Sequence, residues 1–201
     1  MSTVAKGEKA PLLHTQQARE RIITGLSWDA REDKVKLHKK LLQKDSQHDL
    51  DISCYIYDKS GEFIDFVGAE AQDSMDESGK VYHSGDDNTG TGDGDDEFIS
   101  TELALIPNKI HGIVFMIEVR SAHTFKDVDE PYARLADGFD DKNLVESYMT
   151  AEEGAEANAF VFASIYRSLA SPTGWMVHNI SEFPDITQIN DWGTYLKQFI
   201  D

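Results

Sequence analysis

The segment from Gly85 to Glu97 concentrates chemically active side chains more densely than any other stretch of this chain. Its thirteen residues include six carboxylates and four glycines, with no Lys or Arg. Two carboxylates about 4 Å apart repel by roughly 4 kcal/mol at an effective dielectric of about 20, so six in one ordered loop need a compensating positive charge. A hard divalent cation that collects oxygen ligands is the simplest source. The segment predicts a Ca²⁺ site, with Mg²⁺ as second choice because Mg²⁺ needs only one or two carboxylates.

Other interpretations of the same segment depend on its individual residues. Gly, Asp and Asn also favour tight turns, so a solvated hairpin loop without a metal stays open. An EF-hand loop running from Asp86 to Glu97 would need Gly at its sixth position, where this chain has Thr91. A Zn²⁺ site is disfavoured because His83 is the only soft ligand nearby.

The acidic loop joins two predicted β-strands, at residues 80–84 and 98–103. Residues 49–58 alternate between polar and apolar, and a turn then leads into 63–67, which predicts a hairpin. Further strand candidates lie at residues 21–29, 112–120, 132–136, 144–149, 159–167 and 174–180. Many short strands separated by turn signals predict a mainly β fold, an antiparallel β-sandwich over residues 21–180.

Two candidate ligands outside the loop are Asp49 and Asp51. Because they are two residues apart, a strand would direct both to one face, and that face would join the site if it meets the loop. Positive φ at the loop glycines would turn backbone carbonyls of Thr89 and Thr91 inward. The loop carboxylates in the predicted site are those of Asp86, Asp93, Asp95, Asp96 and Glu97. Since Ca²⁺ takes about six to eight oxygens, these groups suffice for one ion or for two that share a carboxylate.

Composition limits the function classes. The formal net charge is −18, which disfavours nucleic acid and anionic membrane surfaces as direct partners. At 201 residues with 40% hydrophobic content, one domain with one core is expected. Cys54 is the single cysteine and lies in an apolar alternating run, which predicts a reduced, buried thiol and a cytoplasmic location. No apolar run has the length of a signal or transmembrane segment, so none is expected.

Three segments are predicted to lie outside the sandwich strands. Residues 1–20 are mostly polar and predict a loose N-terminal arm. The Lys-rich stretch 33–44 predicts a short amphipathic helix, whose charged residues form a solvated face or, alternatively, a docking surface for an acidic partner or a second copy of this protein. Residues 181–201 predict a helical extension of the same domain, with a helix over 186–200 packed on the sandwich. Its apolar positions at helical spacing are Ile189, Trp192, Leu196 and Phe199.

Three motifs in this order resemble the tellurium-resistance TerD family: Gly25-Leu26-Ser27-Trp28-Asp29, then Asp49-Leu50-Asp51, then the run from His83 to Glu97. The resemblance covers roughly residues 21–180 and continues in 125–135, in Tyr166-Arg167 and in Trp175. It implies a β-sandwich that binds Ca²⁺ through acidic loops, two ions rather than one, and Asp29 as a further ligand. The chain departs from the family at Asp87, commonly Asn, and at Asn88, commonly basic, so its loop is more acidic.

The resemblance also implies a function. TerD-like proteins belong to bacterial stress-response systems linked to tellurite, phage and chemical insults. A non-enzymatic, calcium-dependent binding or sensing module is therefore expected. Its partners would be other stress-resistance proteins, with a membrane-associated complex as one form of that assembly.

Two alternatives come from other functional classes. A metal-dependent, phosphoesterase-like hydrolase would need a nucleophile motif or a Gly-rich phosphate loop with Lys, and neither is found in the sequence. A Ca²⁺-dependent membrane-binding module would usually carry basic or apolar residues beside the metal, and the loop flanks carry few.

Overall fold

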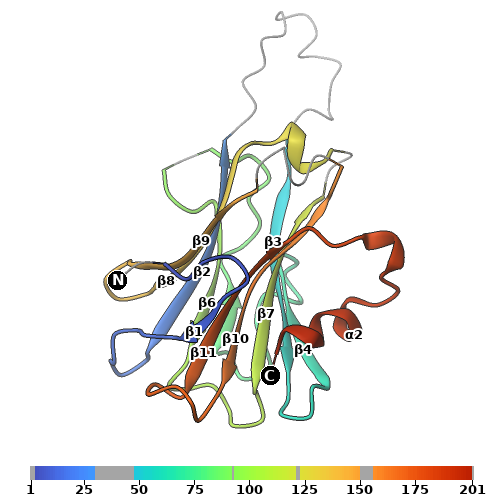
Figure 1. Ribbon diagram of the computed structural model, residues 1–201. Coiled ribbons are helices and arrows are strands. Elements are labelled where there is room, and N and C mark those ends of the chain that lie inside the picture. The colour runs from blue at the N-terminus through green and yellow to red at the C-terminus, as the bar shows by residue number, and fades with distance from the viewer. Residues whose placement is uncertain (1–2, 30–47, 92, 121–122, 150–155, 201) are drawn as a thin grey trace, which may run out of the picture.

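The computed structural model describes residues 3–29, 48–91, 93–120, 123–149 and 156–200, and within them two antiparallel sheets pack face to face (Figure 1). In spatial order, the six-stranded sheet contains β1 (Lys9–Pro11), β11 (Trp175–Glu182), β10 (Ala159–Arg167), β7 (Gly112–Val119), β3 (Leu50–Tyr57) and β4 (Phe63–Val67). The five-stranded sheet contains β5 (Val81–His83), β6 (Glu97–Glu102), β2 (Arg21–Asp29), β8 (Asp129–Asp137) and β9 (Asn143–Tyr148). The predicted antiparallel sandwich is confirmed.

Alternation along each strand builds the core between the sheets. On β3, the side chains of Leu50, Ile52, Cys54 and Ile56 are fully buried in one cluster with residues of the facing sheet such as Leu26. Burying an aliphatic side chain of this size contributes roughly 1.5–3 kcal/mol. The intervening β3 residues point to the outer face of the sheet, which leaves Asp51 beside the end of the core. Cys54 is a free, buried thiol, as predicted.

The N-terminal segment closes one side of the sandwich. Strand β1 pairs with β11, with Lys9 opposite His178, and Leu12 is fully buried. The backbone N–H of Val4 donates to the carbonyl of Leu144 in β9, at 2.9 Å, so this segment contacts both sheets. The expectation of a loose arm is therefore wrong for its described part. A mainly polar segment can still be held because edge pairing uses backbone groups rather than apolar side chains.

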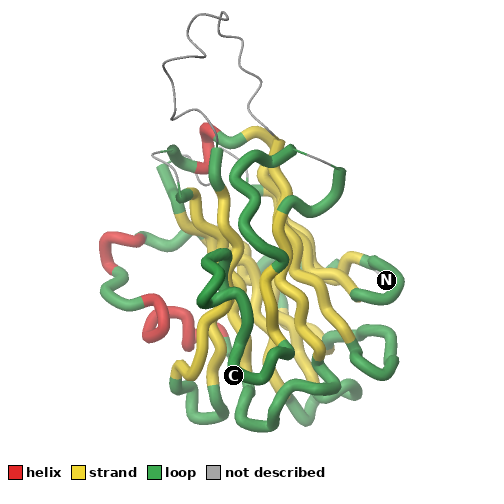
Figure 2. Tube along the Cα trace, turned by 180° about the vertical axis from the view of Figure 1, so that it is seen from behind, coloured by secondary structure: helices red, strands yellow, loops and turns green. Residues whose placement is uncertain are grey.

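The C-terminal segment forms shorter helical turns than predicted. It contains the 3₁₀ turns η2 (Ile186–Gln188) and η3 (Lys197–Phe199), with the α-helix α2 (Trp192–Leu196) between them. The helix begins after Asp191, whose side chain accepts a hydrogen bond from the backbone N–H of Thr194, and this cap fixes its start well after residue 186. Leu196 and Phe199 pack on the outer face of the six-stranded sheet. Figure 2 shows the helical turns of this segment, in red, outside the strands. The predicted packing is thus observed, although a continuous helix over 186–200 is wrong.

Two remaining features complete the fold. One further 3₁₀ turn, η1 (Phe125–Asp127), lies between β7 and β8. The predicted helix over residues 33–44 lies outside the described residues. Of the helices that the structure describes, none is long and apolar enough to cross a membrane.

Candidate metal centre

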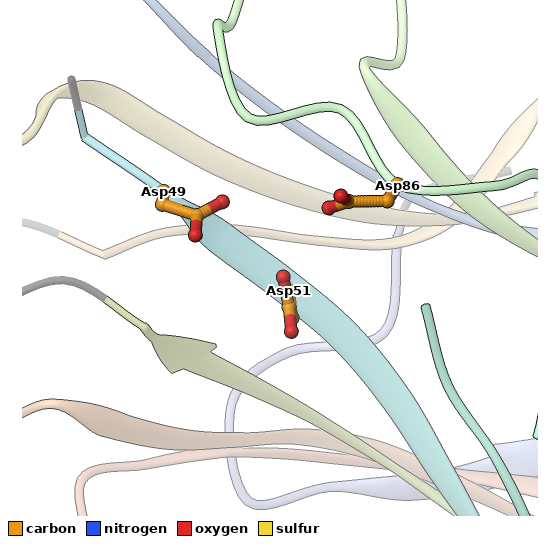
Figure 3. A group of neighbouring side chains, drawn as sticks. All are labelled: Asp49, Asp51 and Asp86. Atoms are coloured by element: carbon orange, nitrogen blue, oxygen red, sulfur yellow. The ribbon is translucent and has the colours of Figure 1, made fainter. Parts of the chain in front are cut away.

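Three carboxylates meet at one end of the sandwich, where the β5–β6 loop reaches the start of β3. The oxygens of Asp49, Asp51 and Asp86 lie within 4.8 Å of one another, and Figure 3 shows the three side chains converging from the strand and the loop. The two-residue spacing of Asp49 and Asp51 puts both on the same side, as predicted. Two oxygens bound to one Ca²⁺ at about 2.4 Å are at most about 4.8 Å apart, so the observed separation matches a shared ion.

The electrostatics of these carboxylates also fit a cation. Burial, followed by the charge of Glu97, raises the pKa of Asp51 from its ordinary 3.8 to about 7. Burial and the neighbouring Asp86 raise the pKa of Asp49 as well. Oxygen Oδ1 of Asp49 is buried and has no hydrogen-bond partner among the described residues. A buried, unpartnered carboxylate oxygen is costly unless a positive ion or water contacts it, so the donor set suits a hard cation.

Arg120 lies beside the cluster and was not recognised from the sequence. Its Nε is 3.2 Å from Oδ2 of Asp51, and its backbone N–H donates to the carbonyl of Asp49 at 2.8 Å. It directly follows β7, which pairs with β3 in the register that sets Leu50 opposite Val119. The guanidinium lowers the pKa of both aspartates against the effect of burial. The protein therefore supplies part of the compensating charge itself.

Glu97 is fully buried and bonds to the backbone instead of to the cluster. Its Oε2 accepts a hydrogen bond from the N–H of Ile52 and its Oε1 accepts one from the N–H of Asp87, each at 3.0 Å. Strand β4 pairs only with Cys54–Tyr57 of β3. The amide of Ile52 therefore lies beyond the β3–β4 ladder and has no backbone partner in β4. The carboxylate satisfies this amide and ties β6 and the acidic loop to β3.

The side chain of His83 contacts the carboxylate of Glu97. Its Nδ1 accepts a hydrogen bond from the N–H of Gly85 at 3.0 Å, so in the neutral ring the proton sits on Nε2. That Nε2 lies 3.3 Å from Oε2 of Glu97. Both side chains are completely buried. The imidazole ring therefore packs against the buried carboxylate of Glu97.

Asp95, predicted as a ligand, is held by Arg134. The guanidinium grips the carboxylate through Nε to Oδ1 at 2.8 Å and Nη2 to Oδ2 at 2.9 Å, and the ion pair raises the pKa of Arg134. The carboxylate lies directly over Gly25 of β2, where any Cβ would fall 2.3 Å from it. The bidentate pair makes Asp95 a structural anchor of the loop. Arg134 therefore supplies part of the positive charge that the acidic loop requires.

Other loop residues form internal hydrogen bonds. Oδ1 of Asp87 accepts from both the N–H and the hydroxyl of Thr89, at 2.7 Å each, and these bonds lower the pKa of Asp87. The hydroxyls of Thr89 and Thr91 are 2.9 Å apart. Burial raises the pKa of Asp96, whose Oδ2 accepts a hydrogen bond from the N–H of Trp28. Asp87 was missed as a turn former, although Asp two residues before Thr is a recognisable turn signal.

Asp29 and Asp93 complete the predicted set, and both are exposed. Asp29 lies opposite Asp129 across the β2–β8 ladder. Among the described residues, no other group of three or more His, Cys, Asp or Glu side chains meets within 4.8 Å. The structure therefore brings Asp49, Asp51 and Asp86 together and does not place the remaining predicted ligands in that group.

Known proteins resemble the chain in sequence and in fold. The TerD domain model matches residues 1–182. A tellurium resistance protein TerD of Alcaligenes sp. is 30% identical over 173 residues, 82% of this chain and 83% of that protein. General stress protein 16U of Bacillus subtilis is 28% identical over 174 residues, again 82% of this chain and 83% of that protein.

A solved structure supports the same assignment at the level of the fold. It is that of a homologue of telluride resistance protein TerD from Streptomyces coelicolor, with a TM-score of 0.64 and 20% identity. The similarity covers 84% of this chain and 92% of that one. Together with the family model over residues 1–182, these matches show that the chain belongs to the TerD domain family.

Proposed function

We propose that this protein is a Ca²⁺-binding, non-enzymatic component of a bacterial stress-response system, which acts in the cytoplasm as a metal-dependent binding or sensing module. Membership of the TerD domain family supports the stress-response part of this proposal. The observation that carries the metal part is the convergence of Asp49, Asp51 and Asp86, together with the unpartnered buried oxygen of Asp49.

The choice of Ca²⁺ follows from the number and origin of the oxygens. Three carboxylates from a strand and a loop form an irregular, oxygen-only set, which Ca²⁺ accepts more readily than Mg²⁺, because Mg²⁺ needs near-octahedral geometry and retains its waters. The proposal is for one ion at this cluster. A second ion would need a carboxylate group that the described residues do not bring together.

Binding would act through the loop. Asp86 belongs to the acidic loop, whereas Asp49 and Asp51 belong to the start of β3, so an ion shared by them would join the loop to the strand. Without the ion, the three carboxylates repel one another and favour separation of the loop from β3. The ordered loop would then present a surface to other stress-resistance proteins, including those of a membrane-associated complex.

The test is calorimetric titration of chelator-treated, desalted protein with CaCl₂ and, separately, with MgCl₂. We expect Asp51→Asn to weaken Ca²⁺ binding by at least about tenfold, because affinity follows the number of charged ligands. Asp93→Asn is the matched control, since it removes the same charge from an exposed loop position outside the cluster.

Three results would reject parts of this proposal. Absence of Ca²⁺ binding by the native protein would remove the metal site, and equal losses in the two variants would assign binding to diffuse loop charge. Phosphatase or nuclease turnover that is lost in Asp51→Asn would replace the non-enzymatic role with that of a hydrolase.

A further inference from the structure

A region of opposite character lies at the other end of β3. Two clefts of about 610 and 650 Å³ share Lys59 and His111 in their linings. Lys59 follows the last residue of β3, Tyr57, whereas the carboxylate cluster lies at the first. At roughly 3.3 Å per residue, the eight-residue strand separates the two regions by about 25 Å. Figure 1 shows β3 running between these two ends of the sandwich.

The clefts are cationic in a strongly acidic protein. The chain contains 37 Asp and Glu residues, yet among the described residues neither cleft lining includes one. The linings instead contribute Lys59, Lys197, Arg167 and His111. No carboxylate of the described residues forms an ion pair with the first three of these. Asp58, next to Lys59, is directed into its own turn, where Oδ1 accepts hydrogen bonds from backbone amides.

Arg167 is held in a fixed orientation without a counter-charge. Its Nε donates to the carbonyl of Ile110 at 2.9 Å, its Nη2 donates to the carbonyl of Ile106 at 3.1 Å, and the guanidinium lies 4.6 Å from the ring centre of Trp175. A guanidinium has five N–H groups, so these two bonds leave three without an acceptor among the described residues. Burial lowers the pKa of Arg167, with no carboxylate to oppose it. A pre-oriented, uncompensated guanidinium is well suited to an oxyanion.

The fold places these side chains along one edge of the six-stranded sheet. Arg167 ends β10, His111 precedes β7 and Lys59 follows β3, and these three strands are neighbours. The backbone of His111 fixes their relative positions, because its N–H donates to Tyr57 and its carbonyl accepts from the N–H of Arg167, each at 2.8 Å. Ser168 adds a hydroxyl group to the second cleft, whereas the hydroxyl of Ser60 in the first donates to Oδ1 of Asp58 at 2.7 Å. The three charged side chains, those of Arg167, Lys59 and Lys197, match the two or more negative charges of a phosphate better than a single carboxylate.

We propose that the joined clefts bind a small phosphate-bearing molecule through Arg167, Lys59 and Lys197. Their volumes lie in the range of about 300–1,000 Å³ typical of small-molecule sites. The site is independent of Ca²⁺, because it shares no residue with the carboxylate cluster at the opposite end of β3.

The test is calorimetric titration of metal-free, desalted protein with inorganic phosphate, pyrophosphate and ribose 5-phosphate in low-salt buffer without Ca²⁺. The double variant Lys59→Gln/Lys197→Gln should bind pyrophosphate at least tenfold more weakly than the native protein. Its matched control, Lys126→Gln/Lys142→Gln, removes two exposed lysines outside the clefts and should bind as the native protein does. Unchanged thermal melting of both double variants separates lost binding from lost folding.

The outcomes are distinct from those of the Ca²⁺ experiment. Absence of binding to all three probes at millimolar concentration, or equal weakening in both double variants, would overturn the phosphate site and leave the calcium proposal untouched. Tighter binding of ribose 5-phosphate than of inorganic phosphate supports an organic phosphate as the ligand, and the reverse order supports the free anion. Amide chemical-shift changes at Ser60 and Ser168, without changes at Asp49, are expected in either case.

Discussion

The two ends of β3 differ in how the chain treats like charges. At one end Asp49, Asp51 and Asp86 are crowded together, although Arg120 and Arg134 already neutralise neighbouring acids. At the other end cations line two clefts, and no Asp or Glu of the described part of the chain belongs to the linings. A net charge of −18 describes the field far from the molecule, whereas each site responds to charges within a few ångströms. A negative net charge alone therefore does not exclude anionic ligands.

The comparison also separates acids that build the loop from acids that are available to a ligand. Asp95, Asp96 and Glu97 bond to an arginine or to backbone amides. Asp49, by contrast, keeps a buried oxygen without a partner among the described residues. Substitutions at the two kinds of acid should therefore affect different properties, stability in the first case and cation binding in the second.

The largest effect is expected from Glu97→Gln, which breaks the link between the acidic loop and β3. The neutral amide can accept only one of the two backbone hydrogen bonds and places an N–H₂ against the other donor. We expect the free energy of unfolding to fall by about 3 kcal/mol in urea titrations. Glu77→Gln, at a side chain 77% exposed, is the control and should cost less than about 0.5 kcal/mol. A loss at Glu97 no greater than at Glu77 would contradict this role.

The second prediction concerns the pH dependence of stability, which should arise at the carboxylate end of β3 and not at the cationic end. Folded Asp51 keeps its proton to about pH 7, whereas the unfolded chain releases it near 3.8. Between these values the folded state binds more protons, so the free energy of unfolding should fall as pH rises from about 4 to 7. Allowing for partial solvent exposure, the loss is about 2 kcal/mol in metal-free protein.

Chemical denaturation at pH 5 and pH 8 measures this slope. Asp51→Asn should remove it, Asp93→Asn should retain it, and CaCl₂ at pH 8 should restore stability by binding the ionised form. A native profile without this decline, or a decline that persists in Asp51→Asn, would show that Asp51 is not the group responsible.

A third prediction compares two loop glycines that both have positive φ. Gly90 has φ of +57°, and an added Cβ would lie 2.4 Å from Nε1 of Trp28 and 2.9 Å from its carbonyl oxygen. Gly94 has φ of +99° but open space around it. Gly90→Ala should therefore lower the free energy of unfolding by about 2 kcal/mol and Gly94→Ala by about 1 kcal/mol. Equal losses in the two variants would mean that the close packing of Gly90 against Trp28 contributes nothing to stability.

The smallest effect is expected from Arg120→Gln. This change removes a half-exposed cation from Asp51, so the cluster becomes more negative and should bind Ca²⁺ about threefold more tightly, equivalent to about 0.6 kcal/mol. Calorimetry of the variant beside Lys126→Gln, which removes a cation paired with Glu156, isolates the local effect. Weaker Ca²⁺ binding in Arg120→Gln would show that the guanidinium positions Asp51 for the metal.

The sequence predicted the parts of the molecule that depend on local periodicity. The bounds of β4 and β10 agree with the expected strands, and the two-residue spacing of Asp49 and Asp51 correctly placed them on one face. The family motifs also led to the correct fold. They too are local features, because they lie on individual strands and on the loop that connects two of them.

Contacts between distant segments could not be read in this way. Arg134 lies 39 residues from Asp95, and the bidentate pair exists because β2 lies between β6 and β8, where Gly25 of β2 has no side chain to block the contact. Arg120 reaches Asp51 through the β3–β7 register. A sequence shows how many charges a loop contains, but the sheet order determines which of them find a protein partner. For this reason the sequence did not reveal that Arg120 and Arg134 compensate part of the charge at the acidic site.

The short outer strands have a consequence for behaviour at high concentration. Exposed strand edges recruit further strands and start fibrils, and natural sheets avoid this with brief edges, Pro and covered backbone groups. Strand β1 has three residues and ends in Pro11, β5 also has three, and the N–H of Val4 occupies a carbonyl of β9. These features disfavour edge-to-edge pairing of concentrated protein at β1, β5 and β9.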